Sequence, residues 1–323
     1  MSYLVTGGAG FIGSHLTDQL LARGDHVVAL DNLSTGRLSN LDAAGRHPNF
    51  RFVQGSILDE LVVDELANEC EVIVHLAAAV GVKLIVEQPL KSLTTNLRGS
   101  ETVIEAAHRY RRKIMVASTS EIYGKNSSDS LVETAARVLG SPTVARWAYS
   151  SAKAIDEVLA YAYAKERGLP TIVARLFNTV GPRQSPAYGM VIPRFIAQAM
   201  QGEPITVFGD GTQTRCFGHV ADIVDGIIRL LDHPEAIGDV FNIGSPGEIS
   251  MLDLARKVID STGSSSPIRM IPYDEAYEAG FEDMQRRVPD TNKLRALTGW
   301  QPTRTLDDIL RDSIAEANVT PSR

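Results

Sequence analysis

Short apolar runs alternate with longer segments of helical periodicity through the first half of the chain. The runs that we predict as strands are residues 3–6, 26–30, 72–76, 113–117 and 171–175, together with a strand around Phe52. The segments that we predict as helices are residues 11–23, 92–110 and 144–167. Because short strands separated by helices are typical of βαβ units, the pattern predicts a parallel sheet with helices on its faces.

The pattern changes after about residue 178, where Pro and Gly become more frequent and the apolar segments become shorter. We therefore expect two parts, residues 1–177 and residues 178–323. Late strands between about residues 205 and 244 are expected to return to the first sheet, with residues 239–243 as the clearest case. Because no flexible linker separates the two parts, we expect them to share a cleft.

Composition and charge narrow the class of protein. Hydrophobic residues make up 44% of the 323 residues and charged residues 22%, which are ordinary values for a globular protein. The net charge of -7 argues against a nucleic-acid partner. The chain has no apolar run long enough for a membrane span and enters its first strand without a basic leader, so we expect no membrane partner and a cytoplasmic location. Cys70 and Cys216 lack ligand spacing, and we expect neither a disulfide framework nor a metal site.

The first predicted strand runs into a glycine-rich turn followed by a helix. Gly7, Gly10 and Gly13 have the GxxGxxG spacing that lets a backbone approach a pyrophosphate at a helix N-terminus. Asp31, 18 residues after Gly13, can accept hydrogen bonds from ribose hydroxyls and would repel a 2′-phosphate. These features predict NAD and a Rossmann-like doubly wound α/β fold with a smaller mixed α/β C-terminal region for the substrate. The alternative is a structural glycine turn, with Asp31 as a helix cap.

Other residues near the predicted strand ends would extend the dinucleotide site. They are Phe11 and Ile12 in the turn, Asn32, Ser34, Thr35 and Gly36 after the second strand, Ser56 and Ile57 after the third, Leu76, Ala77 and Ala78 after the fourth, and Asn96 and Ser118. For the residues after the third and fourth strands, plain packing is almost as good an explanation.

Tyr149 and Lys153 are four residues apart in a predicted helix, so both side chains project from one face. An ammonium beside a phenol lowers the tyrosine pKa, and such a tyrosine can act as general base on a sugar hydroxyl. The polar run from Ser118 to Glu121 follows the fifth strand, at the sheet edge where ligands gather. Together with the glycine turn, the pair predicts a nicotinamide redox site, although a surface helical pair is the simpler alternative.

The chain resembles the extended short-chain dehydrogenases/reductases of the nucleotide-sugar epimerase/dehydratase superfamily. The resemblance runs nearly from end to end, through TGGAGFIG, DNLSTG, HLAA, STSEIYG, YSSAK, RLFNTVGPR, GDGTQTRCF, RRVPD and GWQP. It implies tightly held NAD, a nucleoside-diphosphate sugar as substrate, and transient oxidation of the sugar C4 hydroxyl. It also implies that Tyr149 is the base, Lys153 its partner and Thr119 a hydroxyl near the sugar O4. A homodimer formed through the long helices is implied in the same way.

The segment after the fifth strand separates the reactions that this superfamily performs. Dehydratases resemble this chain but carry Asp-Glu, whereas Ser120 and Glu121 stand here, as in UDP-glucuronate decarboxylases. Residues 146–150, 215–217 and 277–283 also resemble a bacterial decarboxylase domain. We therefore predict a UDP-glucuronate decarboxylase that gives UDP-xylose or a UDP-4-keto-pentose, with Ser120 and Glu121 beside the C5 substituent. The alternatives are a UDP-glucose/galactose-type 4-epimerase, a non-catalytic NAD-binding regulator, and a Glu121 that only binds backbone.

The C-terminal half should supply cations and donors for a UDP-sugar. Arginine forks match phosphate oxygens in pairs. By family position the candidates are Arg215 and Arg287 for the diphosphate, with Arg215 also within reach of the sugar, Asn178 as a further donor, and Val207 and Phe208 against the uracil. Val191 is a further candidate for substrate binding. Lys83 departs from the family pattern, in a loop where no particular cation is expected; it would either hold a carboxylate or phosphate or be solvated. For the Arg286–Arg287 pair, a solvated surface position is the alternative.

Overall fold

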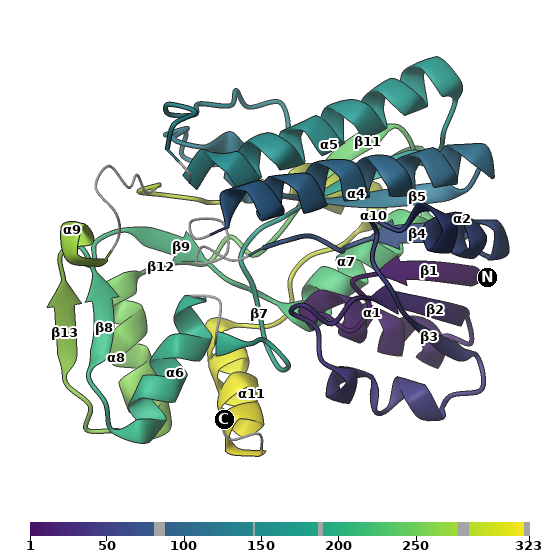
Figure 1. Ribbon diagram of the computed structural model, residues 1–323. Helices are drawn as coiled ribbons and strands as arrows, with labels where there is room; N and C mark the ends of the chain where they lie inside the picture. Colours follow the sequence, from purple (N-terminus) through teal and green to yellow (C-terminus); the bar gives the residue numbers. More distant parts are fainter. Residues whose placement is uncertain (81–87, 145, 187–189, 277–283, 320–323) are drawn as a thin grey trace.

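The computed structural model describes residues 1–80, 88–144, 146–186, 190–276 and 284–319. A large parallel sheet with helices on both faces adjoins a smaller region of helices and short strands (Figure 1). This arrangement confirms the doubly wound α/β class that the alternating pattern predicts.

The large sheet of the described chain has seven strands, all parallel. They are β1 (Ser2–Thr6), β2 (His26–Asp31), β3 (Phe50–Gln54), β4 (Val72–His75), β5 (Lys113–Thr119), β6 (Thr171–Leu176) and β11 (Asp239–Ile243), in the order β11-β6-β5-β4-β1-β2-β3. Thr6 at the end of β1 pairs with Leu30 of β2 on one side and with His75 of β4 on the other. The strand order therefore reverses beside β1, which opens a crevice at the carboxyl ends of β1 and β4.

Apolar helix faces cover both sides of this sheet. The helices α1 (Phe11–Ala22), α7 (Val220–Asp232) and α10 (Asn292–Thr298) bury Leu16, Ile227 and Leu294 against one side. The helices α2 (Glu60–Glu69), α4 (Pro89–Arg109) and α5 (Arg146–Arg167) cover the other side, where Leu66, Ile104 and Ala160 are buried. Each face thus carries its own core, and the two cores hold the strand ends in fixed register.

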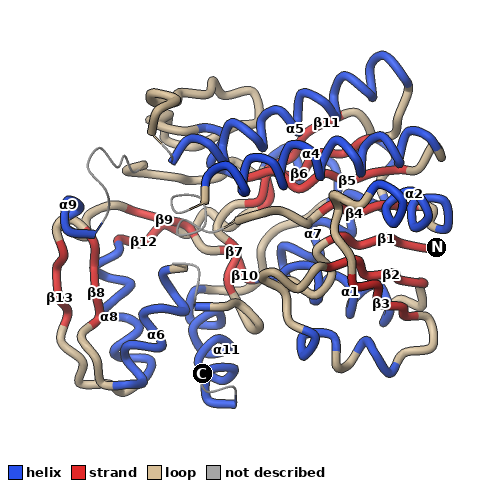
Figure 2. Tube along the Cα trace, in the orientation of Figure 1, coloured by secondary structure: helices blue, strands red, loops and turns tan. Residues whose placement is uncertain are grey.

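Apart from α7 and α10, which pack on the large sheet, the described C-terminal region contains short strand pairs, three longer helices and a single helical turn. The helices are α6 (Val191–Gln201), α8 (Met251–Thr262) and α11 (Leu306–Val319), and α9 (Tyr273–Ala276) is a single turn. The strand pairs are β7 (Thr179–Val180) with β10 (Gly218–His219), β8 (Ile205–Phe208) with β13 (Ile268–Ile271), and β9 (Thr214–Cys216) with β12 (Glu248–Ser250). Figure 2 shows β8 and β13 far from the large sheet. Of the late strands expected to return to that sheet, β11 does so, whereas β8, β9 and β10 pair elsewhere.

Local sequence signals explain where several helices begin and end. The Asp59 carboxylate caps α2 by accepting from the Val62 N–H. Pro89 opens α4, three residues before the predicted start, since proline is tolerated in a first turn. Gly202 and Gly263 end α6 and α8 in the left-handed conformation that glycine adopts without strain. Among the helices in the described ranges, none is both long and apolar enough to cross a membrane.

Candidate active site

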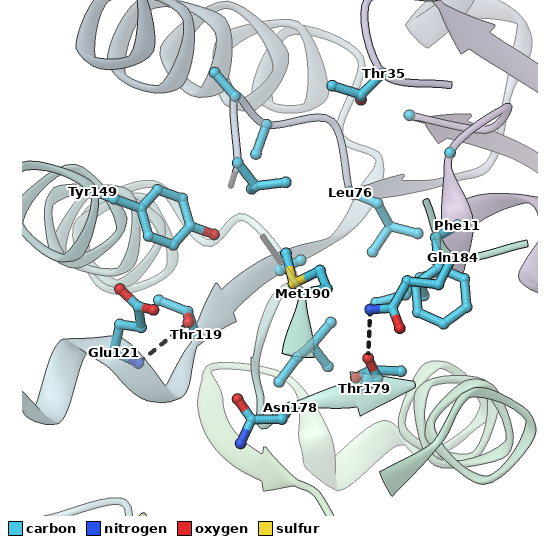
Figure 3. A pocket seen from close by; sticks show the side chains of 18 of the residues that line it. Phe11, Thr35, Leu76, Thr119, Glu121, Tyr149, Asn178, Thr179, Gln184 and Met190 are labelled. Carbon is cyan, nitrogen blue, oxygen red and sulfur yellow. Dashed lines mark hydrogen bonds between the residues drawn. The ribbon is translucent and has the colours of Figure 1, made fainter. Parts of the chain in front are cut away.

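A cavity of about 590 Å³ lies at the carboxyl ends of the central strands, and both parts of the chain line it (Figure 3). Gly7 and Thr119 belong to its sheet side, whereas Met190, Phe208 and Arg215 come from the C-terminal region. One end of the cavity is therefore formed by the glycine-rich turn and the other by β8 and β9.

The glycine-rich turn forms the floor of the first end. Gly7 has a φ of +73°, and its N–H donates to the Leu30 carbonyl at 2.8 Å. A Cβ on Gly13 would overlap the Gly7 carbonyl oxygen, so helix and turn can approach this closely only with glycine there. In the described chain no side chain caps the start of α1, which leaves its first N–H groups directed at the cavity. An anionic pyrophosphate fits such a cradle.

Asp31 lies at the end of β2 and is 8% exposed. Its carboxylate accepts from the Ala9 N–H at 3.0 Å and the Leu33 N–H at 2.8 Å. Burial raises the pKa of this carboxyl above its usual value, and the backbone donors act in the opposite direction. Gly36 is needed beside it, because a Cβ there would lie 2.9 Å from both Asp31 carboxylate oxygens. Asp31 thus both shapes the turn and borders the cavity where a ribose would lie.

Most of the residues expected at the dinucleotide line the cavity. They are Gly7, Gly10, Phe11, Ile12, Gly13, Asp31, Asn32, Ser34, Thr35, Ile57, Leu76, Ala77, Ala78, Ser118, Tyr149 and Lys153. Gly36, Ser56 and Asn96 are not among its lining residues. Asn96 is buried and binds the backbone of Ala79 through both ends of its amide, at 2.7 and 3.2 Å, so it supports the wall of the cavity from behind.

The Tyr149 hydroxyl points into the cavity, and the Thr119 hydroxyl and Glu121 carboxylate face the same space (Figure 3). The sequence predicts that Lys153 lowers the pKa of this phenol. In the protein alone the pKa of Tyr149 is instead raised, first by burial and then by the carboxylates of Glu121 and Asp156. Burial and these two carboxylates therefore favour the protonated phenol, and a positive charge placed beside it, such as that of an oxidised nicotinamide, would favour the phenolate.

The Lys153 ammonium is engaged within its own helix. Its Nζ donates to Asp156 Oδ2 at 3.0 Å, and the side chains are 2% and 1% exposed. Burial raises the pKa of the Asp156 carboxyl, while Lys153 and Ser100 act to lower it. Asp156 was not foreseen from the sequence, because an acidic residue three positions after a lysine usually forms an exposed helical pair.

The turn η3 (Ser120–Tyr123) carries the residues expected beside the sugar. The Glu121 N–H donates to Thr119 Oγ1 at 3.2 Å, and Ser150 of α5 donates to the Glu121 carbonyl at 2.8 Å. Arg287 donates to Ser120 Oγ at 3.2 Å, and its guanidinium lies 3.7 Å from the Glu121 carboxylate. Arg287 is 6% exposed. It thus lies beside η3 in the wall of the cavity and is not a surface residue.

A buried ion pair between Arg175 and Glu157 supports η3. Arg175 of β6 binds the Glu157 carboxylate at 2.7 and 2.9 Å and donates to the Tyr123 hydroxyl at 2.8 Å. The Tyr123 hydroxyl in turn donates to Asn242 of β11 at 2.7 Å. Ser118 donates to Glu157 as well. These contacts join three strands and α5, and so hold the residues after β5 in one orientation.

The remaining substrate candidates differ in where they lie. Arg215, Asn178, Val191 and Phe208 line the cavity. Val207 lies in the core of the C-terminal region, fully buried, because alternate residues of β8 point to opposite faces. Lys83 and residues 277–283 lie outside the described residues.

Sequence analysis missed several residues that line the cavity. They are Lys91, Thr95, Thr179, Gln184, Met190, Arg194, Gln213, Phe217, Met251 and Tyr273. Gln184 and Gln213 belong to the GPRQ and GDGTQTR motifs, and that signal could have identified them. In the described ranges no group of three His, Cys, Asp or Glu residues could hold a metal ion, and Cys70 and Cys216 are free and buried.

The family model for GDP-mannose 4,6 dehydratase matches residues 4–313. A UDP-N-acetyl-alpha-D-glucosaminuronate decarboxylase from Bacillus cytotoxicus is 39% identical over 313 residues, which are 96% of this chain and 96% of that protein. UDP-glucuronic acid decarboxylase 4 from Arabidopsis thaliana is 37% identical over 93% of this chain, which spans 64% of that longer protein.

Solved structures also resemble the chain along nearly its whole length. A UDP-glucuronic acid 4-epimerase from Bacillus cereus, in complex with UDP-glucuronic acid and NAD, has a TM-score of 0.89 and 30% identity and covers 99% of both chains. A UDP-glucose 4-epimerase from Thermotoga maritima with UDP-glucose has a TM-score of 0.88 and 31% identity, again with 99% of both chains covered. The similarity therefore includes the large sheet and the C-terminal region alike.

Proposed function

This chain belongs to the GDP-mannose 4,6-dehydratase family, and from that membership and the cavity we propose that it is an NAD-dependent UDP-glucuronate decarboxylase. The observation that carries the proposal is the side-by-side placement of Ser120, Glu121 and Arg287 in the same cavity as Tyr149. The decarboxylase names of the two curated relatives support it.

The cradle formed by the glycine-rich turn suits NAD. The N-terminus of α1 would hold the pyrophosphate, Asp31 the adenosine ribose, and Lys153 the second ribose. When bound, NAD supplies a hydride acceptor that later acts as the donor. The NAD-bound epimerase from Bacillus cereus supports this assignment.

The first chemical step is oxidation at C4 of the sugar. Tyr149, as phenolate, takes the proton of the O4 hydroxyl, while the hydrogen on C4 leaves as a hydride. Thr119 offers a hydroxyl in the same space to hold O4. Because the pKa of Tyr149 is raised in the protein alone, a positive charge on the bound cofactor would favour formation of the phenolate.

The second step is loss of carbon dioxide. A ketone at C4 is β to the C6 carboxylate, so the C5–C6 bond can break with its electron pair passing into an enolate over C4 and C5. The anionic Glu121 repels the substrate carboxylate and favours its departure, while Ser120 and Arg287 orient it or a proton-donating water at C5. Protonation of the enolate at C5 restores the C4 ketone. This ketone is then either reduced by return of the hydride taken in the first step, which gives UDP-xylose, or released as a UDP-4-keto-pentose.

The C-terminal residues would hold the nucleotide. Arg215 is 8% exposed and lines the cavity, and its guanidinium donates to the Thr214 carbonyl at 2.7 Å. Its remaining donors would bind the diphosphate. Phe208 and Val191 offer apolar surface for the uracil, and Asn178 a side-chain amide that also binds the Cys216 carbonyl at 2.9 Å.

The decisive experiment is incubation with UDP-glucuronate and NAD, followed by mass spectrometry of the sugar nucleotide. A product lighter by the mass of carbon dioxide is expected. UDP-N-acetylglucosaminuronate in a parallel incubation shows which hexuronate is preferred, because the relative from Bacillus cytotoxicus carries that name. Unchanged mass together with conversion of UDP-glucose to UDP-galactose would replace the proposal by a 4-epimerase.

We also propose that the protein is a cytoplasmic homodimer. Ile155, Val158 and Tyr161 follow one another at helical spacing on α5 and are 53%, 66% and 59% exposed, and Leu90 on the neighbouring α4 is 77% exposed. Such an apolar face is usually covered by a partner, and a second copy would pack it against itself. The two buried free thiols suit the reducing cytoplasm.

A further inference from the structure

A line of buried polar side chains lies behind the Tyr149–Lys153 pair. It consists of Thr6 of β1, His75 of β4, Ser100 of α4 and Asp156 of α5, each at most 1% exposed. Thr6 Oγ1 lies 2.8 Å from His75 Nδ1, and His75 Nε2 lies 3.1 Å from Ser100 Oγ. Ser100 binds Asp156, which also binds Lys153. The steps proposed above use Lys153 but none of these four residues.

The donors and acceptors of this line allow one consistent arrangement of protons. An ammonium only donates, so the Asp156 carboxylate accepts from Lys153, and it also accepts the single proton of the Ser100 hydroxyl. The Ser100 oxygen then accepts from His75 Nε2–H, and His75 Nδ1 accepts from the Thr6 hydroxyl. In each hydrogen bond of the line the acceptor is therefore the group nearer to Asp156, and the negatively charged Asp156 carboxylate is the last acceptor.

We propose that Asp156 is a positioning residue: its buried carboxylate, held by Ser100, is the counter-ion of Lys153 and controls how readily the Tyr149 hydroxyl gives up its proton. This inference rests on the proposed function in that it takes Tyr149 as the base. It adds an influence on that base which the spacing of Tyr149 and Lys153 in the sequence does not reveal.

The direction of the control follows from electrostatics. The Asp156 carboxylate disfavours the phenolate form of Tyr149, and such an effect is larger in a buried site than in water. Removing the charge of Asp156 should therefore make the Tyr149 proton leave at lower pH.

The other charged groups around the pair stay the same in that experiment. His75 from β4 is neutral, since burial, with Lys153 as a second cause, lowers its pKa to about 3. Glu121 from η3 and Glu157 of α5 itself keep their carboxylates, and α4 contributes the uncharged Ser100. A change at Asp156 is therefore isolated from these neighbours.

The test is Asp156→Asn, which keeps the shape and an acceptor for Lys153 but removes the charge. The phenolate absorbance of the NAD-loaded protein is followed against pH, and the same titration of a Tyr149→Phe partner in each background is subtracted. We expect the midpoint assigned to Tyr149 to fall by about one pH unit or more. Asp156→Glu should restore the wild-type midpoint, and Glu166→Gln, which removes an exposed carboxylate from the same helix, should leave it unchanged.

A folded Asp156→Asn protein whose midpoint stays in place or rises overturns the proposal, since a purely structural role would change stability and not the titration. If this variant does not fold by circular dichroism, Asp156→Ser provides the same neutralisation with a smaller side chain and must show the same fall. The titration needs no turnover of a sugar. A failure to release carbon dioxide would therefore contradict the proposed function and leave this test intact.

Discussion

At the scale of single residues, Glu121 is the residue that the proposal assigns to loss of carbon dioxide and not to oxidation at C4. Glu121→Gln keeps the size and hydrogen-bonding capacity of the side chain but removes the charge that repels the substrate carboxylate. We expect ketone formation to persist while release of carbon dioxide slows about tenfold, which corresponds to about 1.4 kcal/mol. Single-turnover measurements that follow nicotinamide absorbance and released carbon dioxide separately would measure both steps.

The matched control is Glu203→Gln, an exposed carboxylate in the loop after α6. It should alter neither step. Equal slowing of hydride transfer and decarboxylation in Glu121→Gln would contradict the role given to this residue.

His75 makes the stability of the protein depend on pH. Its pKa falls from 6.5 to about 3 on folding, so the unfolded chain binds a proton that the folded protein excludes. The contribution of His75 is complete above pH 6.5 and is lost as the pH falls toward 3, at a rate that approaches about 1.4 kcal/mol per pH unit. Urea unfolding at pH 7, 6 and 5 should show a steeper decline for the wild type than for His75→Gln.

The comparison with His75→Gln removes the effect of the other histidines. His15 and His219 also have lowered pKa values, but they are present in both proteins and cancel in the difference. Parallel stability curves for the two proteins would contradict this expectation, because they would mean that folding does not lower the pKa of His75.

The candidate site could be predicted from the sequence where a motif is local. The glycines of the turn, Asp31 and Tyr149 all line the cavity, because strand, turn and helix follow each other directly. Val207 and Phe208 differ because a strand presents alternate residues to opposite faces, and the sequence did not indicate which face meets the cavity. The contact between Arg287 and Ser120 joins residues 167 positions apart, so no local pattern could reveal it.

At the scale of elements, α7 binds the segment that follows Trp300 through the side chain of Asp222. Asp222 in its first turn is 3% exposed and accepts from the N–H groups of Thr303 and Arg304 at 3.0 and 2.9 Å and from both of their side chains. Asp222→Ala leaves these donors without a partner and should lower the free energy of unfolding by about 3 kcal/mol. Chemical denaturation would measure the loss.

Asp225→Ala on the same helix is the matched control. Its carboxylate pairs with Arg229 four residues on, and both side chains are 46% exposed. An exposed pair of this kind contributes about 0.5 kcal/mol or less. A loss at Asp222 no larger than the loss at Asp225 would mean that the segment after Trp300 is held by its apolar contacts alone.

The same scale shows why the strands of the large sheet were predictable and the later ones were not. β1, β2, β4, β5 and β6 are apolar runs of four to seven residues between helices, and their type follows from their own composition. β7 and β10 have two residues each and exist only because they pair with each other, across 38 positions of sequence between Thr179 and Gly218. Pairing between distant short segments is decided by the packed molecule.

At the scale of the whole molecule, the exposed apolar face of α5 tests the proposed dimer. In an isologous contact, Val158 of one copy would lie near the same helix of the other, so a charge introduced there is buried twice. Val158→Glu should therefore convert dimers to monomers at micromolar concentration, as measured by sedimentation velocity. Leu61→Glu is the control, because Leu61 on α2 is 83% exposed on a different helix and its replacement should leave the dimer intact. A wild type that already sediments as a monomer would contradict the dimer, and a Val158→Glu protein that remains a dimer would exclude the α5 face as its interface. If both variants dissociate, an added charge on either helix is sufficient, and the interface is not specific to α5.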